Sequence, residues 1–307
     1  MSCPICASKT FNLIGTADRY DMGIPTCQCK GCGLVMTNPV PSEDALSRFY
    51  REHYRRYYRK VESPSESHIE EYGLAERARD TAAFFKAAGL LDGNPHILDV
   101  GCAEGSLLRA ISQVAPHSTR VGIEPNPLFG EFARSWGGAT VYSDLAEVER
   151  VNARFNLIII NHVLEHIREP VLLLQRLIKL GAPDVRIYVD VPDAARYRSL
   201  DDIHIAHLYH FTVASLQNIA ARAGLHAIRV EKHDPTKHPL SVRAVFEVTY
   251  SQQGEPRALV DAERAIVKKH IRRISLLAPA FRFRRSAFGR ALLNAPLRLL
   301  RSFSRAA

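Results

Sequence analysis

The feature that most restricts the fold is a short apolar strand that runs into a glycine turn and then a helix, in the segment ILDVGCAEGSLL at 97–108. Glycine adopts the backbone conformations of a tight turn at little steric cost, so a bound molecule can approach the chain closely there. In open α/β sheets ligands bind at the carboxyl ends of the strands, and the segment therefore predicts a binding loop at Gly101 and Gly105. The Gly-x-x-x-Gly spacing lacks the third glycine of the dinucleotide-binding fingerprint, which argues against a pyrophosphate ligand.

Strand-like and helix-like segments alternate between residues 95 and 251. Segments such as Ser106–Val114 and Pro170–Lys179 have helical character, and the apolar runs around them have the length of single strands. This alternation is typical of a parallel sheet covered by helices on both faces, so the predicted fold class is α/β, a doubly wound Rossmann-like sheet. Only a proline-containing stretch separates the last two strands, which we expect to form an antiparallel pair. The predicted strands are His96–Val100, Arg120–Glu124, Ala139–Tyr142, Leu157–Asn161, Val185–Val191, Ala227–Lys232 and Arg243–Tyr250.

Polar side chains stand at the ends of several of these strands. Glu124 ends the second strand, 23 residues after Gly101, where an acidic side chain can accept hydrogen bonds from ribose hydroxyls. Asp144 follows the third strand, and Asn161 and His162 follow the fourth. Because the carboxyl ends of parallel strands meet at one edge of a sheet, we expect these side chains to line one crevice. The alternative is that the two glycines only make a tight turn in another kind of α/β protein.

The loop and the later strand ends resemble those of the class I S-adenosylmethionine (SAM)-dependent methyltransferases. The resemblance rests on ILDVGCAEGSLL (97–108), GIEPN (122–126), NHVLEHIREP (161–170) and VDVPD (189–193), and covers roughly residues 75–251. It implies that the loop from Gly101 to Gly105 faces the methionine part of SAM, that Glu124 holds the ribose and that Asp144 lies by the adenine amine. The cofactor-binding residues expected on this basis are Asp99, Gly101, Ala103, Gly105, Glu124, Asp144, Asn161 and His162.

Five of the six cysteines lie within the first 32 residues, and four of them form two Cys-x-x-Cys pairs. In a reducing compartment such a cluster indicates a metal site and not a disulfide framework. Two such pairs suit tetrahedral zinc, and four protein ligands close its coordination shell, so the predicted Zn²⁺ is structural. Cys27 is an alternative to Cys29, but only Cys29 has the two-residue spacing to Cys32. The predicted ligands are Cys3, Cys6, Cys29 and Cys32.

A zinc module followed by a SAM-type fold resembles bacterial methyltransferases with an N-terminal zinc-binding domain, some of which modify sugars in antibiotic or surface-polysaccharide pathways. The larger sugar C-methyltransferases of that group carry a further C-terminal domain, and a basic tail stands in its place here, which favours O-methylation of a sugar or another small-molecule hydroxyl. Alternatives are a sugar C-methyltransferase, an RNA methyltransferase and a non-catalytic zinc-ribbon scaffold. The predicted parts are a zinc ribbon at 1–40, a helical connector at 41–94, the methyltransferase domain at 95–251 and a basic helical tail at 252–307.

A histidine-rich strip, IHIAHLYHFT at 203–212, follows the fifth strand. Methyl transfer from a sulfonium needs an aligned acceptor that can lose its proton, and histidine suits a hydroxyl acceptor near neutral pH. We predict His207 as the general base, with Tyr209 or His210 placing the acceptor. The strip resembles a segment of the zinc-containing sugar methyltransferases that carries adjacent Glu and His, but Ala206 stands here at the position of that glutamate.

Other roles for these histidines stay open. His204, His207 and His210 recur at every third position and could be metal ligands, or all three could be ordinary packing or surface residues. His166 is interpreted as a structural residue that opens the helix after it.

Positive charge is concentrated in the C-terminal tail. Residues 256–307 carry 13 Lys and Arg against 2 Asp and Glu, so the rest of the chain is near neutral, which speaks against nucleic-acid binding by the whole protein. Apolar residues recur there at helical spacing between basic ones, and such a helix can lie on an anionic membrane surface or pack on the catalytic domain. Without an evident signal peptide or apolar span, the expected location is the cytoplasm, with peripheral membrane contact through the tail. The apolar residues are Val267, Ile271, Ile274 and Leu277, then Leu293, Leu297 and Leu300.

Overall fold

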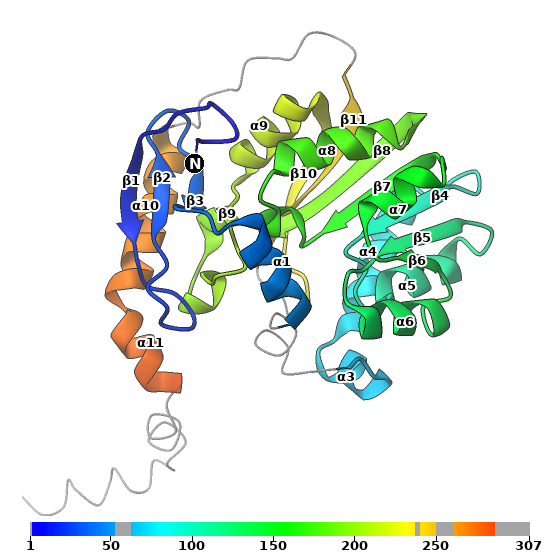
Figure 1. Cartoon of the computed structure of the whole chain (residues 1–307), viewed down its shortest axis with the longest axis horizontal. Coiled ribbons are helices and arrows are strands. Elements are labelled where there is room, and N and C mark those ends of the chain that lie inside the picture. The colour runs from blue at the N-terminus through cyan, green and yellow to red at the C-terminus, as the bar shows by residue number, and fades with distance from the viewer. Residues whose placement is uncertain (1, 53–62, 237–239, 250–260, 286–307) are drawn as a thin grey trace, which may run out of the picture.

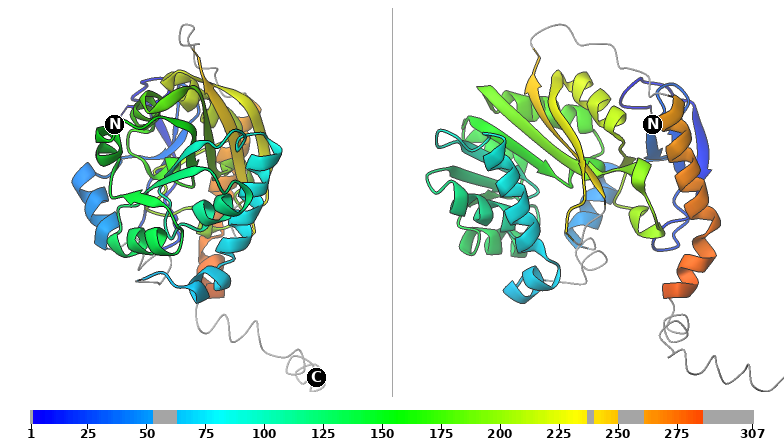
Figure 2. Two further views of the ribbon diagram at one scale, coloured as in Figure 1. Left: turned by 90° about the vertical axis from the view of Figure 1, so that its right-hand side faces the viewer. Right: turned by 180° about the vertical axis from the view of Figure 1, so that it is seen from behind.

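The protein has a large seven-stranded sheet with helices on both faces and a smaller four-stranded sheet beside one of its ends (Figure 1). The computed structural model describes residues 2–52, 63–236, 240–249 and 261–285. The views in Figure 2 show the small sheet and a long C-terminal helix packed together on one side of the large sheet. The arrangement is the Rossmann-like α/β fold expected from the sequence, preceded by a small antiparallel module.

The large sheet has the strand order β10-β11-β8-β7-β4-β5-β6. The strands from β8 through β7, β4 and β5 to β6 pair in parallel, whereas β11 pairs antiparallel with both β8 and β10. The predicted antiparallel pair at the end of the sheet is therefore confirmed. The strands are β4 (His96–Val100), β5 (Thr119–Ile123), β6 (Thr140–Tyr142), β7 (Phe155–Asn161), β8 (Gly181–Pro192), β10 (Leu225–His233) and β11 (Ser241–Val248).

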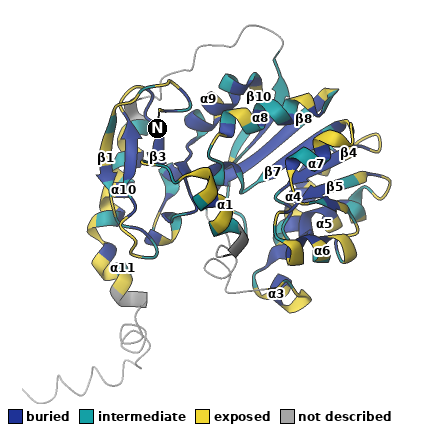
Figure 3. Cartoon of the chain, viewed as in Figure 1, coloured by how far each residue is buried: buried dark blue, intermediate teal, exposed yellow. Residues whose placement is uncertain are grey.

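The two faces of this sheet bury separate cores, and Figure 3 shows β7 and β8 as largely buried. Along β7, Ile158 and Ile160 enter one core while Leu157 and Ile159 enter the other, because successive side chains of a strand point to opposite faces. A strand buried on both faces reads as a continuous apolar run, which is why it was visible in the sequence. The helices on the first face are α7 (Leu145–Arg150), α8 (Pro170–Lys179) and α9 (Val213–Ala223); the second face carries α4 (Leu74–Ala87) and α5 (Ser106–Val114).

Local signals in the sequence fix where the helices next to the strand ends begin. Asn126 caps α6 (Pro127–Ser135) by accepting hydrogen bonds from the amides of Leu128 and Phe129, and Pro127 occupies the first turn, where no amide donor is needed. Thr212 caps α9 through a reciprocal capping box with Ser215. These caps set where each helix starts relative to the strand that precedes it.

The small sheet has the order β1-β2-β3-β9, and its fourth strand comes from far along the chain. Val35 pairs with His210 and Met36 pairs with Tyr209, so the histidine-rich strip completes the N-terminal sheet. The predicted zinc ribbon at 1–40 and the predicted methyltransferase domain at 95–251 thus both contribute strands to this one sheet. The strands are β1 (Phe11–Gly15), β2 (Thr26–Cys29), β3 (Val35–Thr37) and β9 (Tyr209–His210).

The described part of the basic tail packs on this small sheet. In α10 (Asp261–Leu276), Val267, Ile271 and Ile274 are buried in a cluster that also contains Ile14 of β1. The apolar stripe predicted from the sequence is therefore used in packing, except that Leu277 is 41% exposed. Leu293, Leu297 and Leu300 lie outside the described residues.

The described residues include three further α-helices and the short 3-10 helices η1 (Leu164–His166), η2 (Ala194–Arg196) and η3 (Leu200–Asp202). The three α-helices are not suited to a bilayer. These are α1 (Glu43–Glu52), α3 (Glu66–Glu71) and α11 (Ala278–Arg285). Across the described ranges, no helix combines the length and apolar character needed to cross a membrane.

Candidate functional site

A cavity of about 910 Å³ opens at the carboxyl ends of β4, β5 and β7. Open α/β sheets bind their ligands at this edge. Most of the side chains expected at strand ends line this cavity, together with one member of the histidine-rich strip. The predicted residues that line it are Asp99, Gly101, Ala103, Glu124, Asp144, Asn161, His162 and His207.

The two glycines of the binding loop have different tasks. Gly101 has φ +75° and lines the cavity, and a Cβ atom added there would lie 2.6 Å from a methyl group of Val163. Gly105 is not among the residues that line the cavity. A Cβ atom on Gly105 would meet Ala133 of α6 at 3.1 Å, so this glycine allows the start of α5 to pack closely on α6. The resemblance placed Gly105 toward the ligand, whereas its contacts here are with a neighbouring helix.

Glu124 is held rigidly at the end of β5. The side chain is 5% exposed; its Oε2 accepts a hydrogen bond from the Ala103 amide at 3.1 Å and its Oε1 accepts one from the Asn126 amide at 2.9 Å. Each carboxylate oxygen can accept more than one hydrogen bond, so capacity remains for hydroxyl donors of a ligand. The carboxylate is thus anchored by the glycine loop on one side and faces the cavity.

The other polar side chains in this half of the cavity differ in how far they are buried and in their hydrogen bonds. Asp99 is buried, and burial followed by the nearby Glu104 and Glu124 carboxylates raises its pKa to about 7. Asp144 is exposed, and its Oδ1 caps α7 by accepting the Glu147 amide at 2.9 Å. Asn161 carries a buried Oδ1 that has no hydrogen-bond partner among the described residues.

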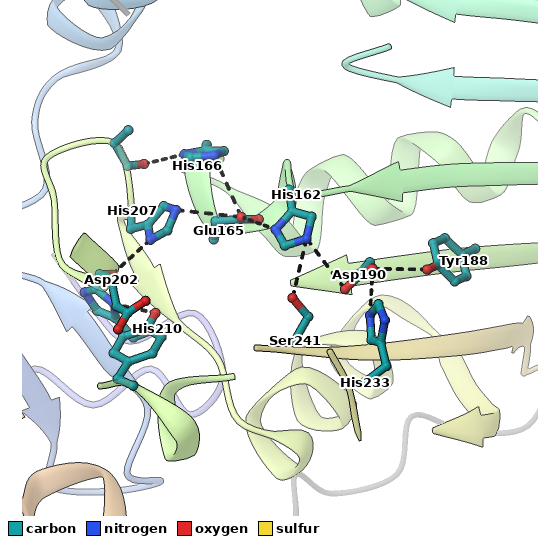
Figure 4. A network of polar contacts seen from close by, with 12 residues as sticks. His162, Glu165, His166, Tyr188, Asp190, Asp202, His207, His210, His233 and Ser241 are labelled. Carbon is teal, nitrogen blue, oxygen red and sulfur yellow. Dashed lines mark hydrogen bonds and ion pairs between the residues drawn. The ribbon is translucent and has the colours of Figure 1, made fainter. Parts of the chain in front are cut away.

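A carboxylate surrounded by imidazoles forms the other half of the cavity (Figure 4). Glu165 is 1% exposed, and its Oε1 lies 3.5 Å from His162 Nδ1 and 3.8 Å from Nε2 of both His166 and His207. Neither carboxylate oxygen accepts a hydrogen bond from any described residue. One ligand atom from each of Glu165, His166 and His207 lies within 4.8 Å of the other two. This separation suits the binding of one metal ion.

Backbone contacts assemble this cluster from two distant segments. The Leu208 amide donates to the Glu165 carbonyl at 2.8 Å, and His166 Nδ1 donates to the Ala206 carbonyl at 2.7 Å. On the other side of the strip, the Thr37 amide donates to the Leu208 carbonyl at 2.9 Å. The strip is therefore fixed between the large sheet and the cysteine module.

Burial keeps His207 in its neutral form. The pKa of His207 is well below its ordinary value, chiefly because burial disfavours the imidazolium and then because His204, His166 and His210 lie nearby. The Nδ1 atom lies 3.3 Å from the Asp202 carbonyl, so it carries the proton and Nε2 carries the lone pair. His207 therefore offers a lone pair toward Glu165, but it is a weak base.

The other members of the predicted catalytic strip do not reach the cavity. Tyr209 is fully buried and its hydroxyl donates to the Arg168 carbonyl at 2.8 Å. His210 is buried beside Tyr197, whose hydroxyl lies 3.0 Å from His210 Nδ1. Both residues form β9, which pairs with β3 in the small sheet, and neither lines the cavity. The geometry therefore does not support the acceptor-placing role expected for them.

The structure brings together a different set of possible metal ligands from the three histidines that the sequence suggested. The set His204, His207 and His210 does not converge in the described structure, whereas Glu165, His166 and His207 do. His166 was expected to open the next helix, but that helix begins at Pro170 and His166 lines the cavity. Neither Glu165 nor the position of His166 in the cavity was expected from the sequence. The adjacent acid and histidine in LEH (164–166) were the available signal.

The four predicted cysteine ligands converge on one point. Cys3 Sγ lies 3.4 Å from Cys32 Sγ, and Cys6 Sγ lies 3.5 Å from Cys29 Sγ; all four sulfurs are within 4.8 Å of one another. Zn–S bonds of about 2.3 Å in a tetrahedron place the sulfurs about 3.8 Å apart, so the residues fit such an ion. Cys27 Sγ instead lies 3.8 Å from the Asn38 carbonyl, which decides the ambiguity in favour of Cys29.

The turn between the second pair of cysteines is built for close sulfur contact. A Cβ atom on Gly31 would lie 2.8 Å from Cys6 Sγ and 3.7 Å from Cys29 Sγ. Any larger residue would therefore enter the space that the thiolates occupy. The described geometry supports a four-cysteine metal site.

Comparisons with known proteins agree with this fold. A family model described as a methyltransferase domain matches residues 68–230. The solved structure of the plantazolicin methyltransferase BpumL in complex with SAH is 15% identical, with a TM-score of 0.52 over 67% of this chain and 94% of that one. The 1,6-didemethyltoxoflavin-N1-methyltransferase of Burkholderia thailandensis, with bound 1,6-didemethyltoxoflavin and S-adenosylhomocysteine, is 17% identical, with a TM-score of 0.51 over 70% of this chain and 96% of that one. A search of curated proteins gives no match.

Proposed function

The chain belongs to the methyltransferase-domain family, and we propose that it transfers a methyl group from SAM to a hydroxyl group of a sugar or another small molecule. The observation that carries this proposal is the shared cavity, which the glycine loop and Glu124 line together with the Glu165, His166 and His207 cluster. The first group suits the donor and the second suits an acceptor that must lose a proton.

In this proposal the donor lies along the ends of β4 and β5. The Glu124 carboxylate accepts hydrogen bonds from the ribose hydroxyls, because it is fixed by the amides of Ala103 and Asn126. The loop at Gly101 contacts the methionine part, and Asp144 lies near the adenine. SAM carries a positive sulfonium, which favours a cavity wall rich in carboxylates such as Asp99.

The acceptor lies on the side of the Glu165 cluster. Methyl transfer needs little activation of the donor, so the protein must align the acceptor oxygen and remove its proton. A hydroxyl is easier to deprotonate than a carbon acid, so the weakly basic His207 favours O-methylation over C-methylation. Acceptors from sugar or polysaccharide pathways carry such hydroxyls and are small enough for a cavity of about 910 Å³.

We also propose that the cysteine cluster binds Zn²⁺ in a structural role. Four protein ligands leave no coordination position for a substrate. The module carries β3, and β3 holds the strip that contains His207. The zinc would thus stabilise one wall of the acceptor site without taking part in the reaction.

A labelling experiment tests the function. Purified protein is incubated with methyl-labelled SAM and a panel of sugars and their matched deoxy derivatives, and products are identified by NMR. The expected product is an O-methyl ether, which is absent for the sugar that lacks the accepting hydroxyl. Label on carbon, label on RNA added in parallel, or failure to bind SAM in calorimetry would contradict the proposal.

A further inference from the structure

We propose that Glu165, His166 and His207 bind a divalent transition-metal ion, which holds two neighbouring hydroxyls of the acceptor. The inference rests on the proposed function for its chemistry, but the metal site itself rests on the residues alone. It is separate from the four-cysteine cluster, because none of its three ligands belongs to that module.

The donor atoms have the arrangement of an open metal site. Glu165 Oε1 lies 3.8 Å from Nε2 of His166 and 3.8 Å from Nε2 of His207. A small inward movement of each side chain brings the three atoms to the bond lengths of an ion at their centre. Two imidazoles and a carboxylate are the donor set of many Fe²⁺, Mn²⁺ and Zn²⁺ sites.

The orientation of both imidazoles is fixed from behind. His166 Nδ1 donates to the Ala206 carbonyl at 2.7 Å, and His207 Nδ1 lies 3.3 Å from the Asp202 carbonyl. A carbonyl oxygen can only accept, so the ring proton of each neutral histidine is on Nδ1 and the lone pair is on Nε2. Metal-binding histidines almost always donate their second ring nitrogen in this way, which fixes the tautomer and the ring direction.

Glu165 supplies an independent observation. Its side chain is 1% exposed, and neither oxygen receives a hydrogen bond from the described residues. A buried carboxylate without donors is costly, and facing the Nε2 lone pair of the neutral His207 adds repulsion. A cation between the three groups removes both penalties, because it pairs with the carboxylate and accepts both lone pairs.

Three protein ligands leave coordination positions open toward the cavity, which the same three residues line. Two adjacent hydroxyls of a sugar can fill these positions as a chelate. The acceptor class that follows is a vicinal diol, such as those of a pyranose ring or a ribose. A cation also lowers the pKa of a bound hydroxyl, as it does for bound water.

The step balances with the groups in the cavity. The hydroxyl that the ion would bind loses its proton to water, because the cation stabilises the resulting alkoxide. The oxygen then attacks the methyl carbon of SAM; the O–CH₃ bond forms as the S–CH₃ bond breaks, and neutral S-adenosylhomocysteine leaves. No oxidant or reductant is needed.

The test is a Co²⁺ titration of protein whose cysteine site is already filled with one equivalent of zinc. Visible absorption of the bound Co²⁺ reports ligand type, since nitrogen and oxygen ligands lack the intense thiolate charge-transfer bands. We expect one further equivalent in the wild type, and binding at least about 100-fold weaker in Glu165→Gln and His207→Ala, because each loses a direct ligand. His210→Asn is the matched control, because this buried histidine of the same strip lies outside the cluster.

The variants are compared only where thermal melting shows that they fold, and Glu165→Gln is included because it preserves side-chain volume. Equal Co²⁺ binding by wild type and Glu165→Gln, or only a thiolate spectrum, overturns the metal site. Methyl transfer at full rate by protein that retains its zinc but holds no second metal also overturns it, while the proposed function stands. Failure to bind SAM with an intact Co²⁺ site has the opposite meaning: the function fails and the metal site stands.

Discussion

The cysteine cluster and the Glu165 cluster are both candidate metal centres, and they are built in opposite ways. The cysteines come as two pairs, each confined to four consecutive residues, and their four sulfurs lie within 4.8 Å of one another. The second cluster joins His166 and His207, which are 41 residues apart and come from different segments of the chain. The first has four ligands and is closed; the second has three and faces a cavity. Closed sites stabilise a fold, whereas open sites can hold a substrate.

The two centres are also physically connected. The Thr37 amide donates to the Leu208 carbonyl, and the Thr37 hydroxyl lies 3.3 Å from the His207 carbonyl. Met36 of the module is fully buried in the same core as Leu208 and Tyr209. Loss of the cysteine cluster should therefore also disturb the Glu165 cluster, whereas loss of the Glu165 cluster should leave the cysteine cluster intact.

The largest expected effect is loss of the closed centre. Cys29→Ser should abolish zinc binding and unfold the module, because structural zinc sites contribute about 10–16 kcal/mol of binding free energy in small zinc-finger peptides. Turnover should fall with it, since β9 loses its partner strand. Zinc content by elemental analysis and turnover are measured together. Cys27→Ser is the control and should keep its zinc; a zinc-replete Cys29→Ser protein would refute the ligand assignment.

Next in size is the loss of the open centre. His207→Ala should lower turnover by about 10²–10⁴, the range for losing a group that assists loss of the acceptor proton, because it removes a ligand of the ion that would bind the acceptor hydroxyl. SAM affinity and zinc content should stay at wild-type values, because this residue contacts neither site. Steady-state kinetics and calorimetry check this, with the exposed His226→Ala as control. Near-normal turnover in His207→Ala would remove the strip from the reaction.

The donor side of the cavity should respond more moderately. Glu124→Ala should weaken SAM binding by about 1–3 kcal/mol, the scale of hydrogen bonds to a charged group. Zinc content should not change. Calorimetric dissociation constants give the answer, and Glu131→Ala on the exposed side of α6 is the control. An unchanged SAM affinity would show that Glu124 does not hold the ribose.

The pH dependence of SAM binding should follow Asp99. Its pKa of about 7 in the free protein means that it is largely protonated below neutral pH. Bound SAM is positively charged and favours the ionised carboxylate, so affinity should rise as pH increases through about 7 and level off above it. Asp99→Asn should flatten this profile, measured by calorimetry between pH 6 and 8. A rise of equal size in Asp99→Asn would place the titrating group elsewhere.

The smallest expected effect concerns the link between the centres. Thr37→Val removes the hydroxyl contact to the His207 carbonyl and should cost about 0.5–1.5 kcal/mol of stability, the net worth of one hydrogen bond. Its zinc content should be that of the wild type. Chemical denaturation and turnover are compared with Thr10→Val, whose hydroxyl lies in an exposed turn of the same module. The coupling predicts a larger fall in turnover in Thr37→Val than in Thr10→Val, and an equal or smaller fall would contradict it.

Regular periodicity made the fold readable from the sequence. The strand at His96–Val100 and the helices at Ser106–Val114 and Pro170–Lys179 have the predicted bounds, because apolar runs and helix starts are local signals. The cavity residues at strand ends could be foreseen for a related reason: parallel strands bring their carboxyl ends to one edge whatever their exact pairing. The roles of Gly105, Tyr209 and His210 could not, because they depend on which neighbour packs against them.

The sequence by itself determined the α/β sheet, the strand-end positions that line the cavity and the two cysteine pairs. These depend on alternation, spacing and residue type within a few positions. Tertiary structure alone decided that the histidine strip completes the N-terminal sheet and that Glu165 meets His207. Ala206 supplies no carboxylate beside His207, yet the Glu165 carboxylate reaches His207 from another segment. Contacts between distant segments follow from packing and strand pairing, and neither leaves a periodic mark in the chain.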